Sequence, residues 1–334
     1  MIWCCPIHRG ALISDNHVRL RAECCGATFP VVVGIPDLRT SQAAWVDREE
    51  DRQRAEALAA AVPPDDVAGS VRFVFGRRPG WTAAQVERRV EQVLTAADRL
   101  REERETWLAP VMVQPGPILD LGCGPGMLLA ALGGTHQVLG LDVSLEWLVV
   151  ADRMARAVGV TPALAAGHAE ALPLATGTVG AVAALDVLEH VGDQVATIRE
   201  IDRVLAPGGA LAAATPNRFS LGAEPHVGVW GVGWLPRAWQ AGYVRRRTGL
   251  PYAFTRLLSA RELQGMLRSH STLAGRLAPA PVPAAEISRL SGRRRALAKT
   301  YNTLLGWSVF RVVARNFGPF FHLTATKPKL PVAG

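Results

Sequence analysis

The sequence has few of the features that carry a chain into or across a membrane. No apolar segment follows a basic stretch near the N-terminus, which argues against a secretory signal. No uncharged apolar run approaches the roughly 20 residues that a membrane-spanning helix needs. We therefore expect a cytoplasmic protein, and peripheral contact with a membrane remains open.

Cysteine is also scarce, with five residues in 334, and no internal repeat is evident. Four of the five stand as adjacent pairs near the N-terminus, Cys4-Cys5 and Cys24-Cys25. In a reducing compartment such clustering favours a metal site over disulfides. The length and the 49% hydrophobic content suit one large globular domain with appendages.

Acidic residues become rare toward the C-terminus, so the net charge of +8 is unevenly distributed. Residues 1–110 carry 15 basic and 16 acidic side chains, residues 111–217 carry 4 and 10, and residues 218–334 carry 18 and 3. An excess of 15 positive charges in the last third indicates an anionic partner, such as nucleic acid, acidic lipid or a phosphorylated substrate. The alternative is an arginine-rich, solvated surface.

Residues 1–40 are expected to form a small β-rich module with two knuckle-like turns. One turn is Cys5-Pro6-Ile7-His8-Arg9-Gly10 and the other is Cys24-Cys25-Gly26. Two such turns can converge on one tetrahedral zinc ion. The candidate ligands are Cys5, His8, Cys24 and Cys25. The alternative is a module that packs without metal.

This segment resembles the Trm112-type zinc-ribbon-like module that precedes some methyltransferase domains. The resemblance rests on the two turns and on Phe29-Pro30-Val31-Val32-Val33-Gly34-Ile35-Pro36. Two positions depart from the pattern. His8 replaces a cysteine, which zinc tolerates, and Ala22 stands where the second pair would begin. Cys24 or Cys4 is the candidate substitute.

Residues 41–110 are charged and alanine-rich, and we expect a helical linker, with a role as a lid over a ligand cleft left open. Apolar positions recur at helical spacing in Asp47–Ala61 and Thr82–Leu108. The run Pro63-Pro64-Asp65-Asp66 separates the two helices. A purely structural role for these helices is the default expectation.

The stretch Ile118–Gly126 reads as a buried strand that ends in a glycine turn, and the apolar run Met127–Leu132 follows as a helix. Strand, glycine turn and helix form the nucleotide-binding corner of a doubly wound α/β sheet. Glycines at this turn let the backbone approach a ligand without an intervening Cβ. The glycine pattern alone does not identify the ligand.

From residue 111 to 217 strands and helices alternate, which predicts a parallel sheet with helices on both faces. The expected helices are Leu145–Val158, capped by Ser144, and Asp193–Leu205, stopped by Pro207-Gly208-Gly209. The expected strands are Pro117–Leu121, Gln137–Asp142, Pro162–Ala165, Val179–Leu185 and Ala210–Thr215.

Residues 218–334 are expected to supply an acceptor-side insertion and to complete the sheet. A loop over Phe219–Tyr252 is rich in tryptophan, glycine and arginine. A helix is expected over Ser259–Ser269 and a strand over Thr272–Pro281. A basic, apolar helical stretch over Arg289–Asn316 precedes a closing strand over Phe320–Lys327.

Further motifs accompany the glycine stretch in order. Asp142 lies 20 residues after Gly122 at a strand end, where a carboxylate binds ribose hydroxyls in NAD enzymes as well. The runs Gly167–Pro173, Leu185–Val191 and Arg199–Gly209 follow. Together these motifs resemble class I S-adenosylmethionine (SAM)-dependent methyltransferases, in particular the small-molecule branch that includes ubiquinone and menaquinone biosynthetic enzymes. The resemblance implies a Rossmann-like seven-stranded sheet and SAM as cofactor.

The resemblance also implies roles for matching residues. The loop glycines and Asp120 would hold the methionine part of the donor, Asp142 the ribose, and Val143 the adenine. His168 departs from the aspartate that often accepts from the adenine amine. The implied donor-binding residues are Asp120, Gly122, Gly124, Gly126, Asp142, Val143, Ala169, Glu170 and Asp186.

Two histidines are candidates for the general base that an acceptor hydroxyl or amine needs. His190 follows a strand end, and His226 lies in the run Glu224-Pro225-His226. For either residue the alternative is a histidine that only fixes a loop by hydrogen bonds. The methyltransferase fold itself requires no catalytic metal.

The acceptor is the less determined partner. The chain lacks the Asn-Pro-Pro-Tyr type of motif that base N-methyltransferases use, and the fifth strand ends Thr215-Pro216-Asn217-Arg218. Aromatic residues beside arginine suit a sugar, an aromatic ring or a lipid-linked phosphate. Residues 301–321 either rest on a membrane surface or pack on the sheet.

We therefore expect O-methylation of a small-molecule or lipid- or sugar-linked acceptor, and the basic last third leaves an anionic acceptor open. One alternative is a methyltransferase acting on ribosomal RNA, since a zinc module before this fold also resembles the bacterial large-subunit guanine N1-methyltransferases. A second alternative is a non-catalytic SAM-binding scaffold.

Overall fold

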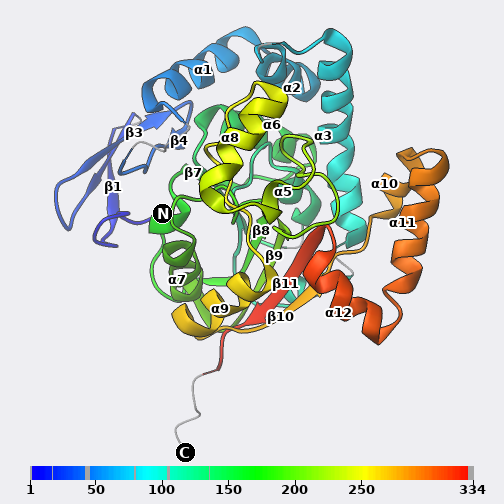
Figure 1. The fold of residues 1–334 in the computed structure, drawn as a ribbon. Helices are drawn as coiled ribbons and strands as arrows, with labels where there is room; N and C mark the ends of the chain where they lie inside the picture. Colours follow the sequence, from blue (N-terminus) through cyan, green and yellow to red (C-terminus); the bar gives the residue numbers. More distant parts are fainter. Residues whose placement is uncertain are drawn as a thin grey trace, which may run out of the picture.

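A computed structural model describes residues 2–16, 18–41, 46–78, 80–103, 106–134 and 136–329. Residues 42–45, 79, 104 and 105 of the expected helical linker lie outside the described residues. The ribbon shows a central sheet wrapped by helices, with a small blue sheet at one edge and an orange helical arm at the other (Figure 1).

The central sheet has seven strands, as expected, in the order β10-β11-β9-β8-β5-β6-β7. Five parallel strands form its core, and at one edge β11 pairs antiparallel with β9 and β10 pairs antiparallel with β11. Their bounds are β5 Ile118–Leu121, β6 Val138–Asp142, β7 Ala163–Ala166, β8 Val179–Leu185, β9 Leu205–Pro216, β10 Ala274–Pro279 and β11 Phe320–Thr326. The sequence placed all seven strands.

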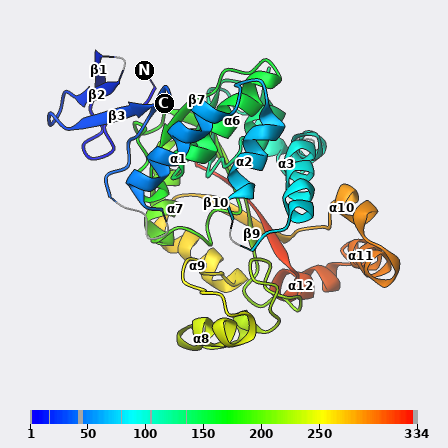
Figure 2. The same ribbon diagram turned by 90° about the horizontal axis from the view of Figure 1, so that it is seen from above.

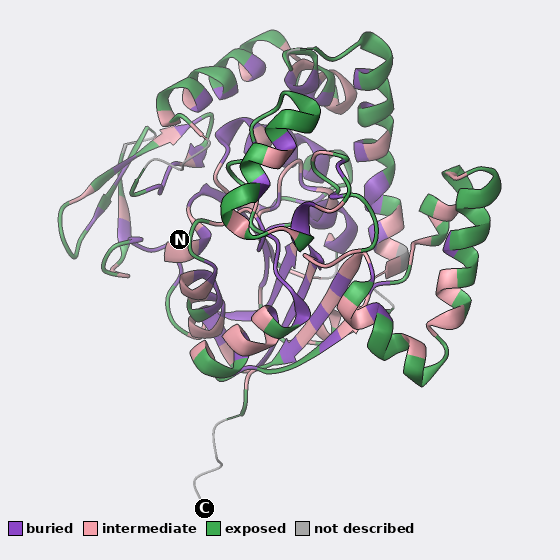
Figure 3. Ribbon diagram, viewed as in Figure 1, coloured by how far each residue is buried: buried purple, intermediate pink, exposed green. Residues whose placement is uncertain are grey.

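Alternate residues of each strand enter two separate apolar cores, as the two-residue period of a strand dictates. Leu119 and Leu139 face one core, while Ile118 and Val138 face the other. The first core is covered by α7 (Gln194–Val204), α9 (Ala260–His270) and the N-terminal strands. The second is covered by the helices α1 (Arg48–Ala61), α2 (Val67–Gly76), α3 (Ala83–Glu103), α5 (Met127–Leu132) and α6 (Leu145–Ala157). Figure 3 shows this buried centre in purple.

Helices α5 (Met127–Leu132) and α6 (Leu145–Ala157) follow β5 and β6 directly. Ser144 caps α6, as predicted, since its side chain accepts from the Trp147 amide. Asp193 caps α7 by accepting from the amides of Val195 and Ala196. Both caps fix where a helix begins at the carboxyl end of the sheet.

The expected stop of α7 at Pro207-Gly208-Gly209 is wrong in detail. The helix ends at Val204, and β9 begins at Leu205. The Pro-Gly-Gly run lies inside β9, where Gly208 has a φ of 84° and the pairing with β8 shifts register. The turn signal therefore marks an irregularity in a strand rather than the end of a helix.

The N-terminal module is a four-stranded antiparallel sheet, with β1 Leu12–Asn16, β2 Arg19–Ala22, β3 Thr28–Val32 and β4 Ile35–Pro36. Its exit segment joins the central sheet, because the Leu38 amide donates to the Ala166 carbonyl. Three helices follow and contribute to the second core: α1 Arg48–Ala61, α2 Val67–Gly76 and α3 Ala83–Glu103. The short α4 (Ala109–Met112) leads into β5.

The segment after β9 contains more helix than expected. A 3-10 turn covers Val232–Trp234, and α8 spans Arg237–Thr248 inside the stretch expected to be a loop. Gly249 ends α8 in the left-handed conformation, with a φ of 75°. Beyond β10 the segment expected to be helical, Arg289–Asn316, contains two helices, α11 Gly292–Leu304 and α12 Ser308–Phe317. A further helix, α10 Ala284–Arg289, precedes them.

No helix in the described ranges is long and apolar enough to cross a membrane.

Candidate functional site

The site is a cavity of about 910 Å³ at the carboxyl ends of β5, β6 and β8. Parallel α/β sheets bind ligands at this edge. Of the predicted donor and base residues, eight line the cavity: Gly122, Asp142, Val143, Ala169, Glu170, Asp186, His190 and His226. Asp120, Gly124 and Gly126 are not among the residues that line the cavity. The residues predicted from the sequence therefore mark the position of the cavity, although only some of them reach its surface.

The glycine turn after β5 uses backbone conformations that other residues avoid. Gly122 has a φ of 68°, and Gly126 has a φ of 81°. A Cβ on Gly122 would lie 2.4 Å from a methyl carbon of Val187. The turn therefore brings main chain, without side chains, to the cavity wall.

Asp142 fixes this turn from the end of β6. Its carboxylate accepts from the amides of Gly124 and Ser144, at 2.9 Å each. Burial raises the pKa of Asp142, and these amides oppose that shift. Each oxygen keeps acceptor capacity for a ligand hydroxyl. The geometry suits the ribose contact that the sequence predicted.

Asp120 lies deeper in the same corner and is 3% exposed. One of its carboxylate oxygens has no hydrogen-bond partner among the described residues. Burial, followed by the charge of Asp142, raises the pKa of Asp120 well above its ordinary value. A buried carboxylate without a donor is costly, so this oxygen is available to a cationic or hydrogen-bonding group.

A buried ionic cluster that the sequence analysis missed supports the loop after β6. The Arg39 guanidinium donates to both Asp37 oxygens, to Asp51 at 2.7 Å and to the Val143 carbonyl at 2.8 Å. The Asp51 carboxylate accepts from the Ser144 hydroxyl and from the amide of Leu145, the first residue of α6. A carboxylate from α1 therefore caps the helix that follows Asp142.

The N-terminal exit segment also reaches the cavity itself. Thr40 and Ser41 line it, and the Ser41 carbonyl lies 2.9 Å from Nε2 of His168. The His168 ring therefore already has a partner on the protein. Nearby, the Glu170 carboxylate accepts from the amides of Gly192 and Asp193. These hydrogen bonds join the segment after β7 to the segment before α7 at the edge of the cavity.

Two carboxylates follow β8. Asp186 opens to the cavity in the left-handed conformation, with a φ of 55°, which aspartate tolerates better than most residues. Burial raises the pKa of Asp186, and the charge of His226 opposes this shift.

Glu189 is buried, and burial raises its pKa to about 7. Oε2 of Glu189 accepts from the Thr215 hydroxyl, whereas Oε1 has no hydrogen-bond partner among the described residues.

His226 and His190 meet at an edge-to-face angle, with ring centroids 4.7 Å apart. Nδ1 of His226 lies 2.6 Å from the Glu224 carboxylate, and Nε2 lies 3.9 Å from Oε1 of Glu189. Desolvation alone would lower the pKa of His226, but the hydrogen bond and charge of Glu224 raise it above the usual value.

His190 has the opposite tendency. Nδ1 lies 3.1 Å from the Phe254 carbonyl, so this nitrogen carries the proton and Nε2 is an acceptor when the ring is neutral. Burial is the main cause that lowers the pKa of His190. The two histidines, whose pKa values move apart, therefore provide one ring that is readily neutral and one that is readily charged.

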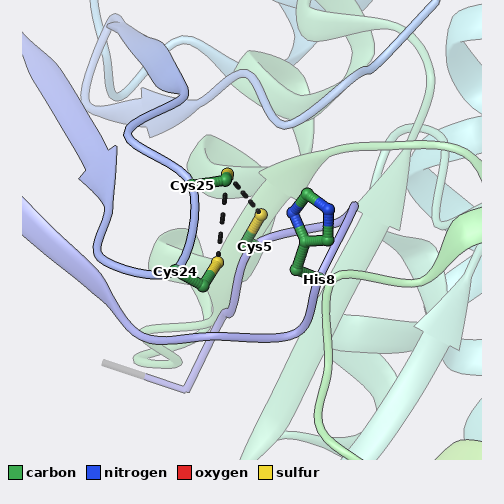
Figure 4. Close-up of side chains that lie close together, drawn as sticks. All are labelled: Cys5, His8, Cys24 and Cys25. Carbon is green, nitrogen blue, oxygen red and sulfur yellow. Dashed lines mark hydrogen bonds between the residues drawn. The ribbon is translucent and has the colours of Figure 1, made fainter.

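Two groups of side chains in the described ranges are arranged to share a metal ion. Ligand atoms of Glu189, His190 and His226 lie within 4.8 Å of one another in the cavity wall. The same holds for Cys5, His8, Cys24 and Cys25 in the N-terminal module. Figure 4 shows the four side chains turned toward one another.

Comparison with known proteins agrees with this geometry. Residues 119–213 match the methyltransferase domain family. The ubiquinone biosynthesis O-methyltransferase of Methylocella silvestris is 32% identical over 212 residues, which cover 55% of this chain and 77% of that relative. The chain belongs to the class I SAM-dependent methyltransferases.

A second relative matches a shorter span of the chain, and a solved structure matches a longer span at lower identity. The ubiquinone biosynthesis O-methyltransferase of Methylobacterium nodulans is 37% identical over 138 residues, covering 38% of this chain and 53% of that protein. A solved Thermotoga maritima methyltransferase, described as a possible histamine N-methyltransferase, is 18% identical with a TM-score of 0.44. That match covers 72% of this chain and 95% of the other.

The cavity fits the donor of this family. Its volume lies within the range of small-molecule sites. It combines a side-chain-free turn at Gly122, a carboxylate at Asp142 and an unpartnered carboxylate oxygen at Asp120. A glycine turn beside a carboxylate at a strand end is the arrangement that binds a nucleoside in such sheets.

Proposed function

We propose that this enzyme transfers a methyl group from SAM to a hydroxyl oxygen of a small-molecule acceptor. The observation that carries the proposal is that His226 and Glu189 line the same cavity as the donor-binding corner, with the buried Glu224 carboxylate against the His226 ring. The ubiquinone biosynthesis O-methyltransferases among the relatives support oxygen as the atom methylated.

In this proposal the donor lies along the ends of β5 and β6. Asp142 accepts from the ribose hydroxyls, Val143 packs on the adenine, and Ala169 and Glu170 border its edge. Asp120 and the backbone of Gly122, Gly124 and Gly126 hold the amino-acid part. When bound, SAM supplies a sulfonium-activated methyl group, and the residues around it orient the two reactants and exclude water.

We assign His226 as the base that takes the acceptor proton at Nε2. Glu224 fixes the ring through Nδ1 and stabilises the imidazolium that forms, as a carboxylate does behind a catalytic histidine. Asp186 and Glu189 add negative charge beside the same ring. His190 is placed to bind or orient the acceptor through its free Nε2.

The test is turnover with purified full-length protein and a panel of phenols, alcohols and amines. We expect methylation of hydroxyl compounds, loss of it in His226→Ala, and no loss on treatment with a chelator. Methylation of amines alone would overturn the assignment of oxygen. Activity that a chelator removes and a divalent ion restores, with the zinc content of the N-terminal module unchanged, would show that Glu189, His190 and His226 hold a metal rather than a proton.

A lipid- or sugar-linked, anionic acceptor is a finer form of the same proposal. Phe254 and Arg256 line the cavity and offer an aromatic face and a positive charge. An untargeted comparison of extracts from cells with and without the gene would reveal compounds that differ by one CH2 group. Methylated ribosomal RNA in that comparison would support the RNA alternative, which stays a prediction.

We further propose that Cys5, His8, Cys24 and Cys25 bind one structural zinc ion. Sγ of Cys25 lies 3.8 Å from Sγ of Cys5 and 3.9 Å from Sγ of Cys24. Tetrahedral zinc with bonds of about 2.3 Å places its sulfur ligands about 3.8 Å apart. A Cβ on Gly10 would lie 2.5 Å from Cys24, so glycine permits the two turns to approach.

Metal analysis of freshly purified protein tests this site. We expect one zinc per chain, lost in Cys25→Ser and kept in the control Cys4→Ser. Cys4 is buried beside the site but lies outside the group of four. Zinc absent from the wild type, or lost equally in both variants, would contradict the proposed ligand set.

A further inference from the structure

Helix α12 presents apolar side chains to solvent instead of to the sheet. Val309, Val312 and Val313 recur at the spacing of one helical face, and Val309 is 80% exposed. Phe317 continues the same face at the end of the helix. Among the residues of α12, Ala314 is the one that is buried. An ordinary surface helix shows the reverse arrangement.

The loop before α8 extends this apolar face. The ring of Trp234 stacks on Phe317, with centroids 5.9 Å apart and an angle of 6°. The Leu221 amide donates to the Phe317 carbonyl, and Nε1 of Trp230 donates to the Leu221 carbonyl. Leu221 and Trp230 are about two-thirds exposed. Figures 1 and 2 both place α12 next to this loop.

We call this surface the apolar ridge and define it by Leu221, Trp230, Trp234, Val309, Val313 and Phe317. Tryptophan is unusual on an exposed surface, and its amphipathic ring suits the headgroup level of a bilayer. Large contiguous apolar surface on a folded chain marks an interaction site. Figure 3 shows α11 and α12 as mainly exposed.

The charge around the apolar ridge identifies its partner. Residues 280–319 contain seven arginines and lysines and one acidic residue, Glu286. The other two acidic residues after position 217 are engaged: Glu224 is buried against His226, and Glu262 pairs with Arg218 and Arg237. Exposed arginines follow the ridge on α12 at Arg311 and occupy the start of α11 and the end of α8. Apolar and aromatic side chains flanked by arginine match an anionic lipid surface.

We propose that the apolar ridge docks the enzyme on an anionic membrane surface, with α12 lying in the interface. The loop that carries Trp230 also carries His226, four residues earlier, and His226 lines the donor cavity. A bridge between Ala223 and Trp230 closes this loop. Docking would therefore hold the bilayer surface next to the acceptor side of the cavity.

Vesicle co-sedimentation of the full-length protein tests the proposal. We expect binding to vesicles of mixed phosphatidylglycerol and phosphatidylcholine, weaker binding at high salt, and little binding to phosphatidylcholine alone. The double variant Val309→Glu/Val313→Glu should bind anionic vesicles at least about tenfold more weakly. The matched control Val113→Glu/Val158→Glu changes two exposed valines elsewhere by the same charge and should bind as the wild type does.

Three results would overturn docking on lipid. An equal loss of vesicle binding in both double variants would show a general effect of the added negative charge. A wild-type dimer that Val309→Glu/Val313→Glu converts to a monomer would assign the ridge to a second copy of the chain. Binding of ribosomal RNA without binding of vesicles, lost in the ridge variant, would assign it to nucleic acid. The measurement needs neither donor nor acceptor, so its failure would leave the proposed methyl transfer standing.

Discussion

The donor side and the acceptor side of the cavity are built in different ways. The donor side takes its residues from consecutive strand ends, and much of it is main chain around Gly122 and Asp142. The acceptor side brings together three distant segments, represented by Glu189, His226 and Phe254. Local sequence therefore determines donor geometry, whereas tertiary packing determines the acceptor geometry. Substitutions on the two sides should affect different measured quantities.

The largest expected effect on the donor side is that of Asp142→Ala. Loss of two hydrogen bonds to a carboxylate, each worth about 1.5 kcal/mol, should weaken SAM and S-adenosylhomocysteine binding about 100-fold in calorimetry. Asp152→Ala, on the outer part of α6, is the control and should bind normally. Unchanged affinity in Asp142→Ala would remove Asp142 from the donor site.

On the acceptor side, His226→Ala should lower kcat about 100-fold, because proton removal by a positioned base contributes at least this much. The Kd for SAM should stay the same, since His226 is not assigned a donor contact. His270→Ala, on α9, is the matched control. A variant that lost SAM affinity but kept kcat would reverse the assignment of the two sides.

Asp51→Asn tests whether the buried cluster supports the donor side from a distance. Because Asp51 pairs with Arg39 and caps α6, its loss should cost about 1–3 kcal/mol in the free energy of unfolding. We expect a smaller, roughly fivefold loss of SAM affinity through displacement of the loop at Val143.

Glu49→Gln, on the exposed side of α1, controls for the change of charge. It should alter neither thermal unfolding nor the Kd for SAM. Reduced stability of Asp51→Asn with a normal Kd would limit the cluster to a structural role.

The smallest effect concerns pH. A base must be neutral to accept a proton, so kcat/KM should rise with pH through the pKa of His226, which Glu224 raises. Glu224→Gln removes that negative charge and should move the acid limb of the profile to lower pH by about one unit. Glu189→Gln serves as a comparison, because burial raises the pKa of Glu189 to about 7. An unmoved limb in Glu224→Gln would exclude His226 as the titrating base.

The sequence predicted the seven strands and the donor motifs because both depend on local pattern. Apolar runs of strand length alternate with helical periodicity, and the glycines of the turn at 122–126 stand in one continuous stretch. The four zinc candidates also converge as predicted, with Cys24 rather than Cys4 in the group.

The remaining features depend on contacts between distant residues. Nothing near Arg39 indicates that it meets Asp51 and the carbonyl of Val143, because those partners lie 12 and 104 residues away. Helix α8 was missed because it contains a glycine, Gly242, and lies in a stretch rich in glycine, tryptophan and arginine that resembles a loop. The prediction for residues 301–321 left packing and membrane contact open, and the exposure of Val309 and Val313 now favours a surface role.

The Arg39 cluster makes the donor-binding motifs hard to transplant. A chimera that borrowed only residues 111–217 would inherit Asp142, Val143 and the glycine turn. It would lack the carboxylate that caps α6 and the guanidinium that holds the Val143 carbonyl. The N-terminal segment and the central sheet should accordingly unfold in a single cooperative transition. A chimera that is to keep this donor site therefore needs the segment that carries Arg39 and Asp51 as well as the donor-binding motifs.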